Sequence, residues 1–74
     1  MIEYIGDWDE DFRHGKGTEF DEELGKIIYK GDWKYDLKNG IGIRYCLESG
    51  RHYIGGFQKN LECGFGSLYE DLGL

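Results

Sequence analysis

Three alternating aspartates near the start of the chain are the side chains best placed to bind a cation. Asp7, Asp9 and Asp11 resemble the start of a calcium-binding loop, where carboxylate oxygens are the main ligands. Such a loop also needs glycine at its sixth position and glutamate at its twelfth, where this chain has Phe12 and Thr18. We therefore predict no metal site, and we interpret the carboxylates as a solvated strand edge that discourages aggregation.

Other residues capable of catalysis are scattered. His14 and His52 share no surrounding pattern, and the chain lacks a nucleophile elbow, a P-loop and a zinc motif. The sequence Gly15-Lys16-Gly17 lies within a predicted hairpin and precedes no helix, so it offers no helix N-terminus to a phosphate. We predict that the chain is not an enzyme and that it takes no cofactor and no small-molecule substrate.

Charge narrows the classes of partner. The formal net charge is −6. Residues 1–28 hold nine acidic and three basic side chains, whereas residues 29–74 hold six of each. A protein that binds phosphates without regard to sequence needs a positive surface. We therefore expect no nucleic-acid partner, and anionic membranes are disfavoured.

The cellular setting is predicted by elimination. No apolar run approaches the ~18 residues of a transmembrane helix, and the first residues lack the pattern of a signal peptide. Cys46 and Cys63 show no zinc-like spacing and are too few for a disulfide framework. We expect a cytoplasmic protein with free thiols.

The elements that position these side chains follow from an internal repeat. Tyr4 to Trp8 (YIGDW) recurs as Tyr29 to Trp33 (YKGDW) and as Tyr53 to Phe57 (YIGGF). Counting the tyrosine as position zero, glycine recurs at positions two, eleven and thirteen. These glycines, which we expect to be structural, are Gly6, Gly15, Gly17, Gly31, Gly40, Gly42, Gly55, Gly64 and Gly66. Repetition with this period is typical of modular β architectures.

Each repeat predicts a β-hairpin. Alternation with period two places the tyrosine, glycine and tryptophan of the motif on one face of a strand. A two-residue turn at positions six and seven suits Asp11, Asp36 and Asn60, since Asp and Asn tolerate positive φ. With that turn, position zero is expected opposite position thirteen, and position two opposite position eleven. A ring at position zero would then cover a facing glycine.

With these residues in view, the chain closely resembles the membrane occupation and recognition nexus (MORN) repeat, whose pattern is Tyr-x-Gly-x-Trp followed by Gly-x-Gly and an aromatic residue. Phe57 replaces the tryptophan in the third repeat, which is the most divergent. The resemblance implies an all-β fold, an elongated single-layer antiparallel sheet of three consecutive hairpins. It also implies an aromatic-lined groove that binds proteins or, in some members, phosphoinositides. We divide the single domain, residues 1–74, into repeats at about 2–26, 27–50 and 51–74.

The aromatic residues at positions zero and four are the candidate partner-binding residues. They are Tyr4, Trp8, Tyr29, Trp33, Tyr53 and Phe57. Stacking between repeats gives such an array its core, yet one layer cannot cover both faces, so part of the ladder could meet a partner peptide or helix. Four isoleucines lie off this ladder and form either a second apolar patch or a docking surface. They are Ile27, Ile28, Ile41 and Ile43.

Our leading hypothesis is a protein-binding scaffold within a larger assembly, cytoskeletal or ciliary by analogy with the family. A peripheral phosphoinositide-binding module is the alternative, and it requires a basic cluster on one face. That cluster would be Lys16, Lys30, Arg44 and Arg51. A third hypothesis is the targeting segment of a larger enzyme.

Overall fold

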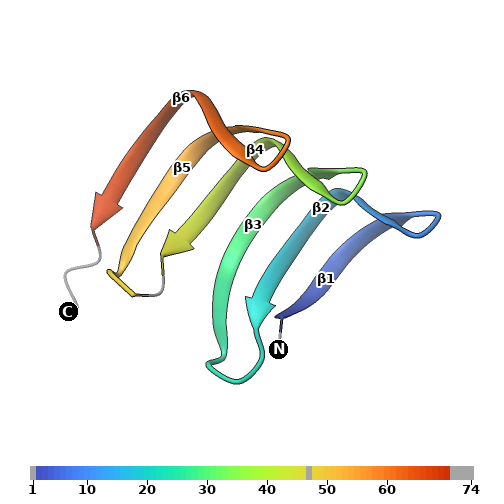
Figure 1. The fold of residues 1–74 in the computed structure, drawn as a ribbon, viewed down its shortest axis with the longest axis horizontal. Coiled ribbons are helices and arrows are strands. Elements are labelled where there is room, and N and C mark those ends of the chain that lie inside the picture. The colour runs from blue at the N-terminus through green and yellow to red at the C-terminus, as the bar shows by residue number, and fades with distance from the viewer. Residues whose placement is uncertain (1, 47, 71–74) are drawn as a thin grey trace.

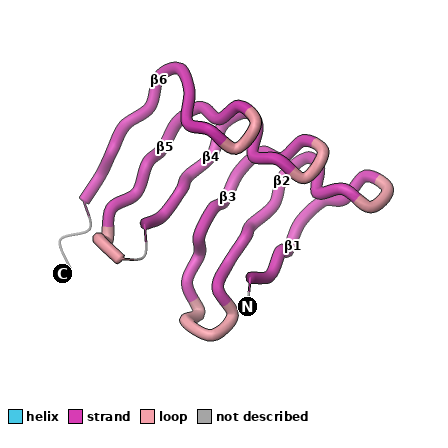
Figure 2. The backbone as a smooth tube through the Cα atoms, in the orientation of Figure 1, coloured by secondary structure: helices cyan, strands magenta, loops and turns pink. Residues whose placement is uncertain are grey.

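Six antiparallel strands form one open sheet in the computed structural model, which describes residues 2–46 and 48–70 (Figure 1). The strands are β1 (Ile2–Asp9), β2 (Phe12–Asp21), β3 (Lys26–Lys34), β4 (Leu37–Cys46), β5 (Arg51–Gln58) and β6 (Leu61–Glu70). They lie side by side in chain order, so β1 and β6 are the edges. Figure 2 shows only strands and short loops along the described chain. The predicted all-β sheet of three hairpins is confirmed.

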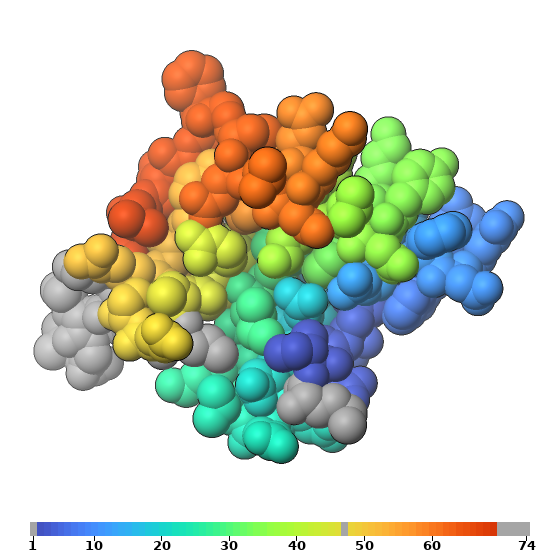
Figure 3. All heavy atoms as spheres, in the orientation of Figure 1, coloured from blue at the N-terminus to red at the C-terminus, as the bar shows by residue number. Residues whose placement is uncertain are grey.

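The sheet is a single layer. Its extents are 40 × 32 × 14 Å, and the shortest is close to the ~10 Å that one sheet occupies in a packed pair. The first and last described strands lie at opposite ends of the molecule (Figure 3). No helix in the described residues is long and apolar enough to cross a membrane. The last part of the third predicted repeat, residues 71–74, lies outside the described residues.

All three hairpins turn at positions six and seven, as predicted. Positive φ occurs at both turn residues of the second hairpin, Tyr35 (49°) and Asp36 (68°), and of the third, Lys59 (49°) and Asn60 (72°). Two consecutive positive φ angles match the twist of the flanking strands. The first hairpin differs, because its positive φ lies at Glu10 (55°) and not at Asp11. The prediction for Asp11 was therefore wrong.

The predicted register holds near the turns and fails beyond them. Trp8 pairs with Arg13 and Asp9 with Phe12, as a two-residue turn requires. Farther along, Gly6 faces Gly17 and not Gly15, so the expected pairing of positions two and eleven is wrong. A bulge between these two stretches inserts extra residues into the returning strand. The same shift occurs in all three hairpins.

In the first two hairpins, glycine and aspartate together explain this bulge. Gly15 and Gly40 adopt φ of 92° and 116°, which side chains rarely tolerate. The Asp7 carboxylate accepts a hydrogen bond from the backbone N–H of Lys16 (3.1 Å), and Asp32 accepts one from Ile41 (2.9 Å). Each carboxylate thus satisfies a backbone donor that the bulge removes from the ladder of strand hydrogen bonds.

The core lies on one face of the sheet, which we call the ladder face because it carries the aromatic ladder. Tyr29, Trp33 and Phe57 are its buried apolar residues among those described, and Tyr4 and Tyr53 pack against them. Strand pairing places Glu19 and Arg44 beside Tyr29 on this face. The other side of the sheet is called the opposite face below.

Candidate interaction surface on the ladder face

The six ladder rings form one continuous chain of edge-to-face contacts across the three repeats. Ring centroids lie 5.0 Å apart for Tyr4 and Trp8, 5.4 Å for Tyr4 and Trp33, and 5.1 Å for Tyr29 and Trp33. The chain continues from Tyr29 to Phe57 (5.0 Å) and from Tyr53 to Phe57 (5.4 Å). Edge-to-face pairs contribute about 0.5–1.5 kcal/mol each beyond the area they bury. The aromatic residue at position four therefore joins its own tyrosine to the tyrosine of the preceding repeat.

Each ladder tyrosine lies over glycine backbone, although its strand partner is not glycine. A Cβ on Gly42 would overlap the ring and hydroxyl of Tyr29, and one on Gly17 would overlap those of Tyr4. Strand pairing also aligns six glycines in a row across the sheet, namely Gly6, Gly17, Gly31, Gly42, Gly55 and Gly66. The aromatic cover over glycine thus exists, but the bulge makes it diagonal.

The buried ring at the centre of the ladder belongs to Tyr29. Its hydroxyl donates a hydrogen bond to the carbonyl oxygen of Asp32 (2.8 Å). Burial, together with the nearby Asp32 carboxylate, raises the pKa of Tyr29 to about 12, because both disfavour the phenolate. Tyr4 and Tyr53 donate in the same way, to Asp7 (2.7 Å) and Gly56 (3.2 Å). The hydroxyls therefore fix the rings over the glycine row.

Exposure changes sharply along the ladder. Tyr29, Trp33 and Phe57 are 0%, 3% and 3% exposed, so the structure places these three candidate binding residues in the core. Tyr4 and Tyr53 are half-buried. Trp8 is 55% exposed although it occupies the same position in its repeat as Trp33 and Phe57. The difference arises because Trp33 and Phe57 each pack against the tyrosine of a preceding repeat, whereas Trp8 lies on edge strand β1.

Charged side chains cover the middle of the ladder face, a feature that the repeat pattern alone did not predict. The Arg13 guanidinium lies 4.5 Å from the centre of the Trp33 ring, a cation–π arrangement. Glu19 pairs with Arg13 (3.3 Å) and with Lys38 (3.8 Å). The alternation with period two that places the aromatic ladder on one face also places these charged residues there. Their position on the ladder face could therefore have been predicted from the sequence of the returning strands. Paired charges therefore lie over the buried rings of the ladder face.

A second missed feature links each repeat to the one before it through the turn residue at position seven. Asp36 donates its N–H to the carbonyl oxygen of Arg13 (3.0 Å) and accepts the Arg13 N–H on Oδ1 (2.7 Å). Asn60 makes the same pair of bonds with Lys38, at 3.0 and 2.8 Å. The backbone hydrogen bond from Arg13, together with its guanidinium, holds the pKa of Asp36 below its ordinary value. Turn residues thus extend the strand pairing between repeats.

Comparison with known protein families decides the identity of this repeated unit. The MORN repeat matches residues 4–21, 29–46 and 53–71, which together make up most of the chain. The chain belongs to the MORN repeat family. No curated protein matches it closely enough to add a further relative. MORN repeats are non-catalytic modules that commonly take part in protein or membrane interactions.

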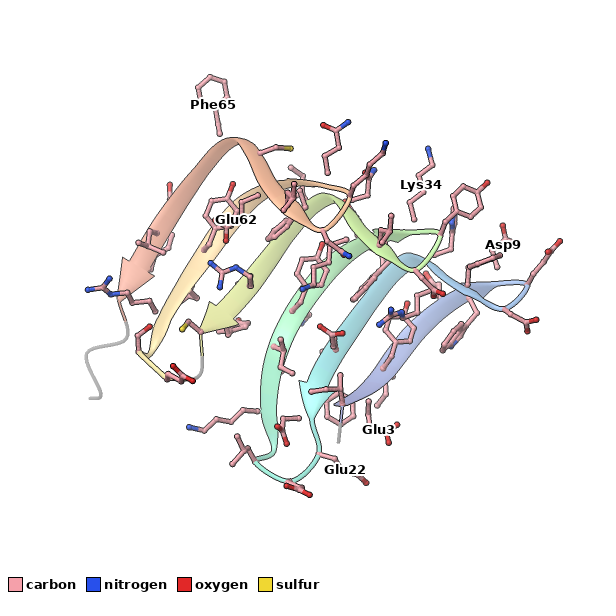
Figure 4. All side chains as sticks on the ribbon, viewed as in Figure 1. Glu3, Asp9, Glu22, Lys34, Glu62 and Phe65 are labelled. Atoms are coloured by element: carbon pink, nitrogen blue, oxygen red, sulfur yellow. The ribbon has the colours of Figure 1, made fainter. Side chains whose placement is uncertain are left out.

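The third MORN repeat lacks the carboxylate of the first two. Gly56 stands where they have Asp7 and Asp32, and it faces Cys63 across the hairpin. Gly64 keeps a positive φ of 69°. The next residue, Phe65, is 99% exposed and projects away from the sheet (Figure 4).

The four basic residues required for a phosphoinositide site do not all lie on one face. Arg44 pairs with Tyr29 on the ladder face, where its side chain bonds Glu62. Lys30 pairs with Thr18 and Ile43 on the opposite face. Lys16 is engaged by the Asp32 carboxylate. Burial raises the pKa of Asp32, but hydrogen bonds from Lys16 and the Ile41 N–H outweigh it, so that the pKa is lowered overall.

Two of the isoleucines off the ladder, Ile41 and Ile43, lie on the opposite face of the sheet. Ile43 pairs with Ile54 there. Ile41, at the bulge of β4, is 63% exposed, and Ile5 on β1 is 68% exposed. A shallow hollow beside Ile5 is lined by Lys16, Thr18 and Lys30. The described residues contain no group of three His, Cys, Asp or Glu side chains that could hold a metal ion.

Proposed function

We propose that this MORN array is a protein-interaction module that binds an extended peptide or a helix of a partner along the ladder face. The observation that supports this function is the exposure of Trp8, 55% against 3% for both Trp33 and Phe57. A large exposed aromatic residue at the open end of a well-ordered ladder is a typical anchor for a partner protein. Within the module, Tyr29, Trp33 and Phe57 support the surface and Trp8 and Tyr4 make the contact.

Charge favours a protein partner over a lipid surface. The net charge is −6, and the basic residues of the lipid hypothesis are divided between two faces, with Arg44 and Lys16 each paired to a carboxylate. An anionic membrane attracts a protein through unopposed basic residues gathered on one side. Phosphoinositide binding therefore remains the second candidate, supported by the family alone.

The proposed setting is a larger assembly in the cytoplasm, cytoskeletal or ciliary by analogy with the family, with no catalysis by the array itself. Cys46 and Cys63 are free thiols, which suits a reducing compartment.

Two exposed residues of β1 allow a matched test of this function. Trp8 lies on the ladder face and Ile5 on the opposite face, and their exposures are 55% and 68%. We expect tagged wild-type protein and Ile5→Ala to capture the same proteins from a cell extract, as identified by mass spectrometry. Trp8→Ala should lose them, because the anchor ring is gone. Circular dichroism should show that both variants remain folded.

Vesicle co-sedimentation separates the two candidate functions. Wild-type protein should remain in the supernatant with phosphoinositide-containing vesicles at ~0.15 M salt, because salt at this concentration screens the attraction between exposed basic residues and the lipid headgroups. Sedimentation with the vesicles at that salt would contradict the protein-binding function. Unchanged capture by a folded Trp8→Ala variant would contradict the assignment of the ladder face.

A further inference from the structure

We propose that the free edge of β1 binds a basic, extended segment of a partner protein as an added antiparallel strand. An arginine or lysine of this segment lies over Trp8, and its backbone is held by Asp11. The inference rests on the proposed function, because it names the partner chemistry at the open end of the ladder. It adds a surface that the ladder face does not include, namely the unpaired backbone of an edge strand.

The array already contains a bound example of this arrangement, formed by β2 against β3. Gly15 pairs with Trp33 and Gly17 with Gly31. Arg13, at the end of this pairing, has its N–H and carbonyl bonded by Asp36, while its guanidinium lies 4.5 Å from the centre of the Trp33 ring. One turn residue and one tryptophan thus seat both the backbone and the side chain of an arginine.

Two further contacts hold β2 on β3. The Trp33 indole Nε1–H donates to the carbonyl oxygen of Gly17 (3.1 Å). The Lys16 ammonium, three residues after Arg13, binds the Asp32 carboxylate. The strand seated on β3 therefore supplies two basic residues three positions apart, with glycine between them. The receiving strand supplies tryptophan and one carboxylate, Asp32, and the turn after it supplies the second, Asp36.

Edge strand β1 repeats the receiving half of this arrangement. Asp7, Trp8 and Asp11 occupy the positions of Asp32, Trp33 and Asp36 in their repeat. Strand β1 pairs on one side only, with β2, and Trp8 is correspondingly exposed. The turn also differs: both engaged turns have positive φ at position seven, and Asp11 does not. The first repeat thus has the same side chains as the second, without the strand that they hold there.

Charge identifies the occupant as basic. Residues 1–28 carry nine acidic and three basic side chains. Two of the acidic residues, Asp7 and Asp11, occupy the repeat positions of Asp32 and Asp36, which bind Lys16 and Arg13. Burying Asp11 against a strand that lacks a basic residue at the position of Arg13 would leave its charge unpaired, which is costly.

A second copy of this chain fits the edge poorly. Its free strand β6 has Glu62 and Phe65 at the positions that Arg13 and Lys16 occupy in the first repeat. Docking β6 on β1 would place Glu62 against Asp11, and like charges at such contacts are unfavourable. The edge therefore fits a segment of another protein with a basic pair three residues apart.

The test uses a synthetic peptide with the sequence of residues 12–21, the strand that β3 already binds. The full chain, labelled with ¹⁵N, is titrated with this peptide to ~1 mM and followed by nuclear magnetic resonance, which detects binding of that strength. We expect shifts in the amides of β1 and in the Trp8 indole N–H, with those of β6 unchanged. A peptide with glutamate in place of its arginine and lysine should bind at least tenfold more weakly.

Matched variants separate the edge from the ladder face. Asp11→Ala and Asp9→Ala each remove one exposed carboxylate near the same turn, but only Asp11 occupies the position of Asp36. We expect Asp11→Ala to weaken the peptide about tenfold, as for loss of hydrogen bonds to a charged group, and Asp9→Ala to change it less than twofold.

Several outcomes of these experiments would overturn the edge inference. The first is the absence of chemical-shift changes at ~1 mM peptide, and the second is equally strong binding of the charge-reversed peptide. The third is an equal effect of Asp9→Ala and Asp11→Ala on peptide binding. The last is a change in the β1 shifts with protein concentration when no peptide is present. The last outcome would identify a second copy as the occupant. If Trp8→Ala abolishes peptide binding and Asp11→Ala does not, the segment lies on the ladder face, so the proposed function stands while the edge inference fails.

Discussion

At the scale of single residues, the ladder tyrosine of each repeat contacts at least one neighbouring ring, covers a glycine and donates a hydrogen bond to a backbone carbonyl. Tyr29 contacts Trp33 and Phe57, covers Gly42, and donates its hydroxyl hydrogen to the Asp32 carbonyl. The glycine is needed because any side chain there would occupy the space of the ring. Sequence spacing predicted which tyrosine would cover glycine. It did not predict the hydroxyl contact, because that contact depends on where the bulge places the Asp32 carbonyl.

Because the pKa of Tyr29 is raised, the free energy of unfolding should change with pH in the alkaline range. The folded value is about 12 against an ordinary 10.0, so the hydroxyl contributes stability below pH 10 that is lost as pH rises toward 12. We expect Tyr29→Phe to cost about 1 kcal/mol at neutral pH through the lost hydrogen bond. It should also lose less stability than wild type between pH 10 and 12. Urea unfolding across that range measures both, and parallel pH profiles for the two proteins would contradict this role.

At the scale of strands and turns, the repeats are joined by residues whose types look ordinary in the sequence. Asp36 and Asn60 were predicted as turn residues, and that prediction is confirmed by their positive φ. Their bonds to Arg13 and Lys38 of the preceding repeat could not be predicted, because they require knowing which repeats are neighbours. The strand register predicted beyond the turn was also wrong. A two-residue turn implies regular pairing along both strands of the hairpin. The structure instead has a bulge, which the Asp7 and Asp32 carboxylates stabilise in the first two hairpins by accepting a backbone N–H.

Substitutions at Asp36 test this link between repeats. Asp36→Gly keeps a residue that tolerates positive φ but removes the carboxylate, so we expect a clearly lower urea midpoint. Asp36→Asn should lower it less, because the Asn60 amide oxygen accepts the equivalent backbone N–H, that of Lys38.

Asp11→Gly is the control for this substitution, since Asp11 has the same position in its repeat but no preceding repeat among the described residues to bond. It should leave the midpoint nearly unchanged. A midpoint for Asp36→Asn as low as that for Asp36→Gly would exclude the proposed link.

At the scale of the whole molecule, the same sequence position has different roles along the array. The MORN fold and its three repeats were predictable, because glycine and aromatic spacing recurs through most of the chain. Exposure along the ladder was not, because it is set by the neighbouring repeat. Trp8 and Trp33 have the same local sequence, Gly-Asp-Trp, and only the latter packs against a preceding repeat. The aromatic residue at position four therefore belongs to the core wherever a repeat precedes it, as Trp33 and Phe57 do, and we propose a binding role for Trp8 at the open end.

The most direct test of this division is the free energy of unfolding of Trp33→Ala and Trp8→Ala, measured by urea titration with circular dichroism. We expect Trp33→Ala to lose about 3–5 kcal/mol, as for truncation of a buried aromatic residue, or to be unfolded without urea. Trp8→Ala should lose less than about half of that, since its ring is 55% exposed. A loss at Trp8 equal to or greater than that at Trp33 would contradict the division of the ladder into a buried core and an open binding end.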